Sequence, residues 1–367
     1  MLKRTRPAAL GGGLRKRAQR LALLAGSLLF SFLLFESYIR ATWTSQWQIP
    51  SDAAQAPGIF SFRMKPDHES DIATMDGPLF HVKTNARGFR GPLVSAIASK
   101  PLKVIFLGDS FTFGWGVALE EQGLWRFMDS YHSAHPDRDV GRAWVACGSW
   151  DPKDYYFAYL TEAAVAKPDL VVVGLFTGND VMPLDAPRVL DPSQVPYVEK
   201  LPEPLKPWFR SVDWLRAQFS GSLFIAKLRA RQGPAAYALF EKDLEKQRKL
   251  WDTTFFYVTA LDAAVRRNGG RLVIVLYPSM LQVNTPDALA DAGYDPGMPE
   301  RTLGQFADER HLELITLLGA LRARNEKRDL YFAKDRHLTA RGNEVAAGVF
   351  GRELGPIIDR AWLAKSF

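Results

Sequence analysis

Residues 103–117 read KVIFLGDSFTFGWGV and join a short apolar run to an abrupt polar turn. The run Val104–Leu107 is β-branched, aliphatic and aromatic and ends at Gly108, which is typical of a buried strand in a parallel sheet. Ligands of such sheets gather at the carboxyl ends of strands, where Ser110 would lie. A serine on a strand-to-helix turn has the exposed hydroxyl that a nucleophile requires. Gly-Asp-Ser also forms ordinary turns, so this stretch alone leaves both interpretations open.

Strands and helices are predicted to alternate after Ser110. The apolar runs predict strands at 143–147, 169–176 and 271–277 and a short last strand at 329–332, and the 3–4 residue spacing of apolar positions predicts helices at 154–165, 240–267, 310–324 and 339–354. In the third of these helices, Leu312, Ile315, Leu318, Gly319 and Leu321 are expected to face inward. Residues 288–301 are expected to form a loop. This alternation predicts an α/β fold with three layers, α/β/α, around a mostly parallel central sheet.

Polar or glycine residues follow several of these strands: Ser110, Gly148, Asn179, and the pair Asp335 and His337. A hydroxyl becomes a useful nucleophile only when a base accepts its proton. His337 is the best candidate for that base, because Asp335 is close enough in the sequence to orient its ring and to stabilise the imidazolium. Three donors are then available for an oxyanion: the backbone N–H groups of Ser110 and Gly148 and the side-chain amide of Asn179.

In this order the residues resemble the SGNH (GDSL-type) hydrolase superfamily. The matching blocks are GDSF at 108–111, Gly148, GND at 178–180, and Asp335 with His337. The resemblance covers 101–354 and implies a serine hydrolase with Ser110 as nucleophile, His337 and Asp335 as its partners, and no cofactor or metal. Asp109 and Asp180 are expected to brace the loops of the site.

Two sequence features resemble those of a membrane-tethered bacterial branch of this superfamily, whose members are linked to modification of surface polysaccharides. One is the segment Asn85–Arg90, NARGFR, before the serine strand. The other is the two-residue step from Asp335 to His337, which resembles the acid-x-histidine motif of alginate O-acetyltransferase-like proteins. Local sequence alone predicts solvated loop positions for Arg87 and Arg90.

The N-terminal 40 residues combine a basic tail with an apolar segment. Residues 21–39 read LALLAGSLLFSFLLFESYI, close to the roughly 20 residues that cross a bilayer. A signal peptide would need a small-x-small cleavage site, which 37–40 does not offer. A buried core helix would not carry so basic a leader. We therefore expect residues 1–20 to be a cytoplasmic tail, 21–40 an uncleaved transmembrane helix, and the remainder to lie outside, in the periplasm.

Two segments lack clear periodicity. Residues 41–100 are expected to be an irregular linker that wraps onto the domain at 101–360. Within that domain, 182–234 is expected to be an insertion rich in proline and aromatic residues. Its apolar positions at 208, 212, 215, 219 and 223 have helical spacing, which suits packing on the core, a cap over the site, or contact with a membrane.

Composition excludes several functional classes. The net charge of +7 is matched by the basic residues that precede position 21, namely Lys3, Arg4, Arg6, Arg15, Lys16, Arg17 and Arg20. The rest is nearly neutral, so nucleic acid is not an expected partner. The single cysteine, Cys147, excludes an intramolecular disulfide framework. No cluster has the spacing of zinc ligands.

Three functions remain open from the sequence. The first is an esterase acting on an acylated carbohydrate outside the cytoplasm. The second is an O-acyltransferase for an exopolysaccharide, which would need a membrane partner to supply the acyl group. The third is a catalytically silent glycan-binding or assembly component. Hydrolysis and transfer share the nucleophile and differ in how water is excluded, so these residues do not separate them.

Overall fold

The computed structural model describes residues 11–42, 54–55, 58–76, 79–182, 188–195, 211–212, 214–215 and 237–365. The chain divides into two compact units. One comprises residues 1–45 with 203–220, and the other comprises 46–202 with 221–367. The candidate site lies in the second unit.

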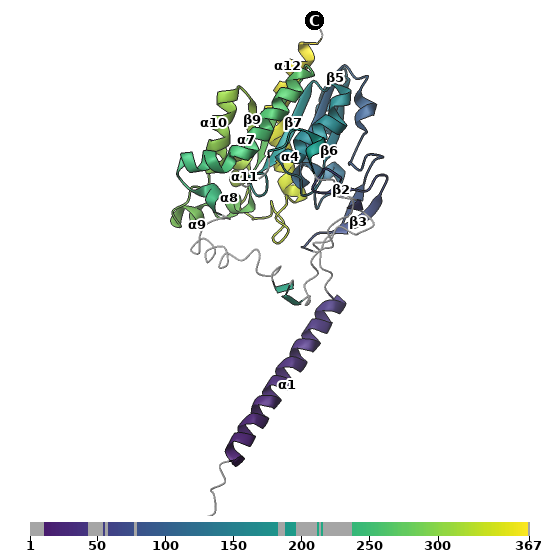
Figure 1. Ribbon diagram of the computed structural model, residues 1–367. Helices are drawn as coiled ribbons and strands as arrows, with labels where there is room; N and C mark the ends of the chain where they lie inside the picture. Colours follow the sequence, from purple (N-terminus) through teal and green to yellow (C-terminus); the bar gives the residue numbers. More distant parts are fainter. Residues whose placement is uncertain are drawn as a thin grey trace, which may run out of the picture. The chain divides into compact units, whose positions relative to one another are not determined.

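A five-stranded sheet forms the centre of the second unit (Figure 1). All its strand pairs are parallel, in the order β6-β5-β7-β8-β9. The strands are β5 (Leu102–Gly108), β6 (Val140–Ala146), β7 (Leu170–Phe176), β8 (Arg271–Tyr277) and β9 (Glu313–Thr316). The register pairs Gly108 with both Ala146 and Gly174, so β5, β6 and β7 end at one edge. The predicted α/β fold with a parallel central sheet is therefore confirmed.

Helices cover both faces of this sheet. The helices of three or more turns are α3 (Gly123–Ala134), α7 (Leu244–Arg267), α10 (Met298–Arg310) and α12 (Ala340–Leu363), and the shorter ones are α2 (Ser110–Phe113), α4 (Pro152–Ala158), α8 (Met280–Asn284), α9 (Pro286–Asp291) and α11 (Leu318–Ala323). Successive side chains of a strand point to opposite faces. Ile105 accordingly joins the core with α4, α7 and α10, and Phe106 joins the core with α3, α11 and α12.

The first unit contains one long helix, α1 (Gly11–Thr42). Within it, residues 19–42 contain an 18-residue window that has a mean hydropathy of 1.8 and is largely exposed, so the helix is long and apolar enough either to span a membrane or to be a signal sequence. In the same unit Glu36 accepts hydrogen bonds from the Arg40 side chain at 2.6 Å and from the Ser211 amide at 2.9 Å. The rings of Phe35 and Trp214 meet edge to face at 5.6 Å.

The helix predicted over 310–324 is wrong. The chain instead forms strand β9 and then the short helix α11. Leu312, Ile315, Leu318 and Leu321 are buried as predicted, whereas Gly319 is exposed. Apolar residues at this spacing suit both elements, and pairing with β8 decides for a strand because it supplies the backbone hydrogen bonds.

Two other predictions about local structure differ from what is observed. Where the sequence predicts a loop at 288–301, the chain forms most of α9 and the start of α10, each with a proline in its first turn, where no N–H is needed. The last strand, predicted at 329–332, is reduced to a single antiparallel bridge between Tyr331 and Leu338. The insertion at 182–234 lies mostly outside the described residues.

The segment before β5 is more ordered than an irregular linker. It contains an antiparallel hairpin, β3 (Glu69–Ala73) with β4 (Leu79–Lys83). The solvated position predicted for Arg90 is wrong, because only 2% of this residue is exposed. Its guanidinium donates to the backbone carbonyls of His81, Phe113, Gly114 and Val117 at 2.9–3.2 Å, and burial lowers its pKa to about 10. Arg90 therefore ties this segment to the turn that follows Ser110.

Replacing Arg90 with methionine is expected to lower the free energy of unfolding by about 3 kcal/mol or more, because several buried carbonyls lose their donor. Urea unfolding of the purified full-length chain in detergent, followed by tryptophan fluorescence, measures the change. Arg341→Met is the control, since this exposed side chain pairs with Glu344 at the surface and its loss should leave the free energy of unfolding close to that of wild type. Equal stability of the two variants would contradict the assigned role of Arg90.

Candidate active site

Ser110 is the first residue of α2, directly after β5 and Asp109. The Asp109 carboxylate caps this helix by accepting a hydrogen bond from the Phe111 amide at 2.9 Å. Gly108 is required at the end of the strand, because a Cβ there would lie 2.2 Å from the Thr112 hydroxyl oxygen. The turn therefore combines a tight strand end with a capped helix, and it presents the Ser110 hydroxyl at the carboxyl edge of the sheet.

His337 reaches Ser110 from a loop more than two hundred residues later. Its Nε2 lies 2.7 Å from the Ser110 hydroxyl oxygen, and its Nδ1 contacts the Asp335 carboxylate. The intervening Arg336 has a positive φ of 68°, so the chain turns sharply and both side chains point toward the serine. The three residues predicted from the sequence thus form a continuous serine–histidine–aspartate chain of contacts.

Asp335 is held by residues that sequence reasoning did not single out. Its second carboxylate oxygen faces the Met75 amide at 3.3 Å and the Trp115 indole N–H at 3.4 Å. Asp76 accepts hydrogen bonds from the amides of Lys334 and Asp335 at 2.8–3.1 Å. Burial opposes the ionisation of Asp335, but the hydrogen bond and charge of His337 outweigh it and hold the pKa below its usual value. Asp335 is therefore ionised at neutral pH.

The two other predicted oxyanion donors flank the serine turn. Asn179 follows β7, and its amide donates to the Trp150 carbonyl at 3.3 Å and is close enough to Asp109 to lower the pKa of that carboxyl. Gly148 follows β6. The residue before it, Cys147, donates its amide to the Gly108 carbonyl at 3.2 Å. No heavy atom lies within 4 Å of the position that a Gly148 Cβ would occupy. Both donors thus come from strands paired with β5, and open space lies beside Gly148.

A buried acidic pair lies beneath the serine turn, as expected for Asp109 and Asp180. Burial raises the pKa of Asp109 to about 6, and burial together with the charge of Asp109 raises that of Asp180. Asp180 accepts hydrogen bonds from the Tyr155 hydroxyl at 2.9 Å and from the Phe176 amide at 2.7 Å. These contacts tie the turn after β7 to α4 and to its own strand, and neither carboxylate contacts the Ser110 hydroxyl in the bonds described.

A mostly apolar cavity of about 400 Å³ adjoins His337. Its lining includes Phe111, Phe176, Val181, Leu250, Met280 and Leu281, with Asp335, Arg336 and His337 at one side. A cavity of this size is ordinary for a small organic ligand. The site can therefore receive a substrate group next to the proposed base.

The described residues contain no group of three or more His, Cys, Asp and Glu side chains placed to hold a metal ion. Cys147 is buried near the site, and burial raises its pKa to about 12, so it is a neutral thiol. The described side chains at the candidate site supply a hydroxyl, an imidazole and a carboxylate.

Comparison with protein-family models and with curated proteins found no match. Among solved structures, the chain is similar to the acetyl xylan esterase AlAXEase, with 16% identity, a TM-score of 0.41, and coverage of 68% of this chain and 98% of that one. It is also similar to a catalytic mutant of the acetylxylan esterase Axe2 from Geobacillus stearothermophilus, with 14% identity, a TM-score of 0.41 and coverage of 69% and 94%. A third is the psychrotrophic esterase EstA from Pseudoalteromonas sp., with 12% identity, a TM-score of 0.40 and coverage of 70% and 98%. At this level of similarity, the activity of this chain has to be inferred from its own site.

Replacing Asp335 with asparagine is expected to lower kcat on an aryl ester by about 10⁴-fold, because an amide cannot stabilise the imidazolium and favours the wrong tautomer of His337. Steady-state rates at neutral pH measure the effect. Asp129→Asn, on the surface of α3, is the control and should keep wild-type kcat. A rate for Asp335→Asn within tenfold of wild type would remove Asp335 from the mechanism.

The same substitution should change how stability depends on pH. The folded-state pKa of Asp335 is lower than its unfolded value, so its contribution to stability is present above the unfolded pKa and is lost as pH falls through the folded pKa. Asp335→Asn should therefore lose less stability than wild type when pH is lowered below about 4. Urea midpoints measured between pH 6 and pH 3 test this sign.

Replacing Asn179 with alanine is expected to lower kcat by about 10²–10³-fold with little change in KM, because one donor to the developing oxyanion is lost. Stopped assays on the same aryl ester give both constants. Asn268→Ala, which removes a partly buried amide donor at the end of α7, is the control. A proportional rise in KM with unchanged kcat would mean that Asn179 binds the substrate and does not stabilise the transition state.

Proposed function

We propose that this protein is a serine-dependent acyl-ester hydrolase. The observation that carries the proposal is the contact of His337 with both Ser110 and Asp335. Ser110 Oγ attacks the ester carbonyl carbon while His337 Nε2 accepts its proton. The N–H groups of Ser110 and Gly148 and the Asn179 amide stabilise the oxyanion. His337 then protonates the leaving alcohol, and water, activated by the same nitrogen, releases the acid and restores the serine.

The substrate that we propose is an acetylated carbohydrate outside the cytoplasm. The sequence resemblance to polysaccharide-modifying proteins supports this choice, and so does the apolar helix α1. In this proposal α1 stays uncleaved and spans the membrane once, with the basic tail in the cytoplasm and the catalytic unit in the periplasm. The cavity beside His337 supplies space for one side of the ester.

The alternative is an O-acyltransferase that passes the acyl group from Ser110 to a hydroxyl of an exopolysaccharide. The Asp335-Arg336-His337 spacing favours it, because it resembles the acid-x-histidine motif of O-acetyltransferase-like proteins. The first half of the reaction is unchanged, and a sugar hydroxyl replaces water in the second half. A membrane partner would then supply the activated acyl donor.

Fluorophosphonate labelling of the purified full-length chain tests the nucleophile. We expect a covalent adduct on Ser110 in wild type, none in Ser110→Ala, and slow labelling in His337→Ala, because the base is missing. Ser95→Ala, at an exposed serine, is the control and should label like wild type. A folded wild-type chain without an adduct would instead support a silent binding or assembly component.

Product analysis separates hydrolysis from transfer. Wild type is supplied with an aryl acetate together with an unacetylated oligosaccharide, and free acetate and acetylated sugar are both measured. The hydrolase proposal expects acetate as the main product and release of acetyl groups from acetylated glycans. Faster formation of acetylated sugar than of acetate would favour the transferase.

A further inference from the structure

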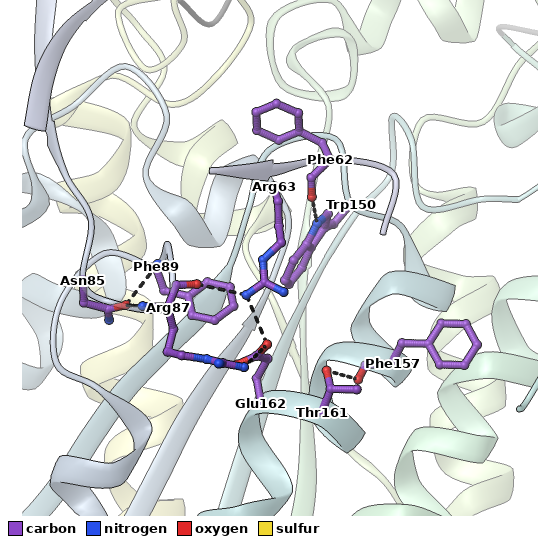
Figure 2. A network of polar contacts seen from close by, with 9 residues as sticks. All are labelled: Phe62, Arg63, Asn85, Arg87, Phe89, Trp150, Phe157, Thr161 and Glu162. Carbon is purple, nitrogen blue, oxygen red and sulfur yellow. Dashed lines mark hydrogen bonds and ion pairs between the residues drawn. The ribbon is translucent and has the colours of Figure 1, made fainter. Parts of the chain in front are cut away.

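A short segment near the start of the second unit packs on the loop that follows β6. The ring of Phe60 stacks on the indole of Trp150, with centroids 5.0 Å apart and an angle of 19° between the planes. The Trp150 indole N–H donates to the Phe62 carbonyl at 2.7 Å, as Figure 2 shows. Trp150 is fully buried, so its position is set by these contacts.

Ser61 adds hydrogen bonds to the same loop. Its hydroxyl lies 2.9 Å from the Ser149 carbonyl oxygen and 2.5 Å from the Asp154 carboxylate, and its amide donates to Asp154 at 3.2 Å. Ser149 needs such support because its φ of 64° lies in the left-handed region, which costs energy for a residue with a Cβ. Residues 60–62 therefore hold the loop 148–150 by both its side chains and its backbone.

An ion-pair group anchors this segment to the rest of the unit. Arg63 donates to the Glu162 carboxylate at 3.1 Å and to the Arg87 carbonyl at 3.0 Å, and Arg87 donates to the same carboxylate at 2.8 Å (Figure 2). The Glu162 side chain is only 4% exposed. Phe89 completes the contact, with its ring edge to face with Trp150 at 5.9 Å. Salt screens a partly buried ion pair less than a surface pair. This group therefore holds residues 60–63 in place against the rest of the unit.

The loop 148–150 leads to the candidate oxyanion donors. Gly148 adjoins Ser149, whose carbonyl faces Ser61. The Trp150 carbonyl accepts a hydrogen bond from the Asn179 amide at 3.3 Å, and the Tyr155 hydroxyl oxygen lies 3.4 Å from it. A shift of the loop would thus move one donor directly and release the other from its partner. Donors act on a transition state only when they are held in place beforehand.

We infer that Ser61 is a positioning residue of the active site: together with Phe60 it holds the loop 148–150 so that Gly148 and Asn179 face the oxyanion. This inference rests on the proposed acyl-ester chemistry at Ser110. Residues 60–62 therefore support the active site through Gly148 and Asn179, without touching the substrate.

The geometry around Ser61 also suits a protonated Asp154. A hydroxyl has one proton, yet the Ser61 oxygen lies near two acceptors, the Ser149 carbonyl and Asp154. If Asp154 carries a proton, it donates to Ser61 Oγ, and the Ser61 proton is free for Ser149. Burial raises the pKa of Asp154 to about 7, against the hydrogen bonds from Ser61, which lower it, so the protonated form gains population as the pH falls through about 7.

Several other groups face Asp154. The charge of Asp151 raises its pKa and the charge of Lys153 lowers it. Cys147 and Tyr257 also interact electrostatically with Asp154, and Arg63 interacts with Cys147. Burial raises the pKa values of the thiol and of the phenol, so both stay neutral near pH 7. Among the groups of this set whose pKa is shifted, Asp154 is the one that changes charge near pH 7.

Steady-state kinetics of full-length Ser61→Ala test the inference. We expect kcat on an aryl acetate to fall about tenfold, which corresponds to about 1.4 kcal/mol, with KM unchanged. Ser61→Thr keeps the hydroxyl and should recover most of the rate. Thr161→Ala is the matched control: it removes a hydroxyl in the same neighbourhood whose hydrogen bond stays within its own helix, to the Phe157 carbonyl (Figure 2).

Asp154→Asn gives a second readout. Asparagine has the shape of the protonated acid, so its amide can donate to Ser61 at every pH. The ratio of kcat in Asp154→Asn to kcat in wild type should therefore rise as pH increases through about 7, where wild-type Asp154 loses its proton. Ser61→Ala should abolish this rise in the double variant, because the hydroxyl that connects Asp154 to the loop is gone.

The outcomes separate this inference from the proposed function. If wild type hydrolyses the ester and labels at Ser110, while Ser61→Ala keeps wild-type kcat or loses activity only through KM, the positioning role is wrong and the hydrolase stands. A flat kcat ratio for Asp154→Asn would also overturn the proton arrangement. Absence of any reaction or adduct in wild type would reject the proposed function itself.

Discussion

The candidate site depends on one hydrogen bond, between the Ser110 hydroxyl and His337 Nε2. A serine hydroxyl is a weak nucleophile unless a base is oriented to accept its proton, and an imidazole is oriented only when its other nitrogen is held. Here the second nitrogen contacts Asp335, and Asp335 is held in turn by Met75 and Trp115. Met75, the stretch with Ser110 and Trp115, and the pair Asp335 and His337 come from three distant parts of the sequence, so the chain must fold before these groups can react together.

Parallel pairing brings these parts together. Because β5, β6 and β7 end at one edge, the turns that contain Ser110, Gly148 and Asn179 become neighbours. The acids beneath them, Asp109 and Asp180, are buried and have raised pKa values, which is costly for folding unless their oxygens are hydrogen-bonded. The bonds from Tyr155 and from the amides of Phe111 and Phe176 offset that cost and make the turns rigid. The same buried polar network therefore stabilises the fold and holds the turns of the site in place.

The segment before β5 contributes as much to this network as the strand ends do. Arg90 satisfies carbonyls in the turn after Ser110, Met75 and Asp76 hold the Asp335 loop, and residues 60–62 hold the loop after β6. Residues that precede the parallel sheet in the chain thus contact the turn after Ser110, the Asp335 loop and the loop after β6. This arrangement gives a physical reason why residues 58–76 and 79–100 pack on the catalytic unit and are more than a spacer.

The sequence by itself determined the parallel α/β core, the apolar helix near the N-terminus and the choice of Ser110, His337 and Asp335 as candidate site residues. Each of these features can be recognised in a short stretch of sequence, as an apolar run, a glycine at a strand end, or a histidine beside an acid. It did not distinguish strand β9 from a helix, since Ile315 and its neighbours suit both until β8 offers hydrogen bonds. It predicted a solvated Arg90, because the carbonyls that bind this side chain are brought to it only by folding. The supporting roles of Met75, Trp115 and Ser61 were likewise decided by the tertiary structure, because an amide, an indole or a hydroxyl acquires such a role only from the partner placed opposite it.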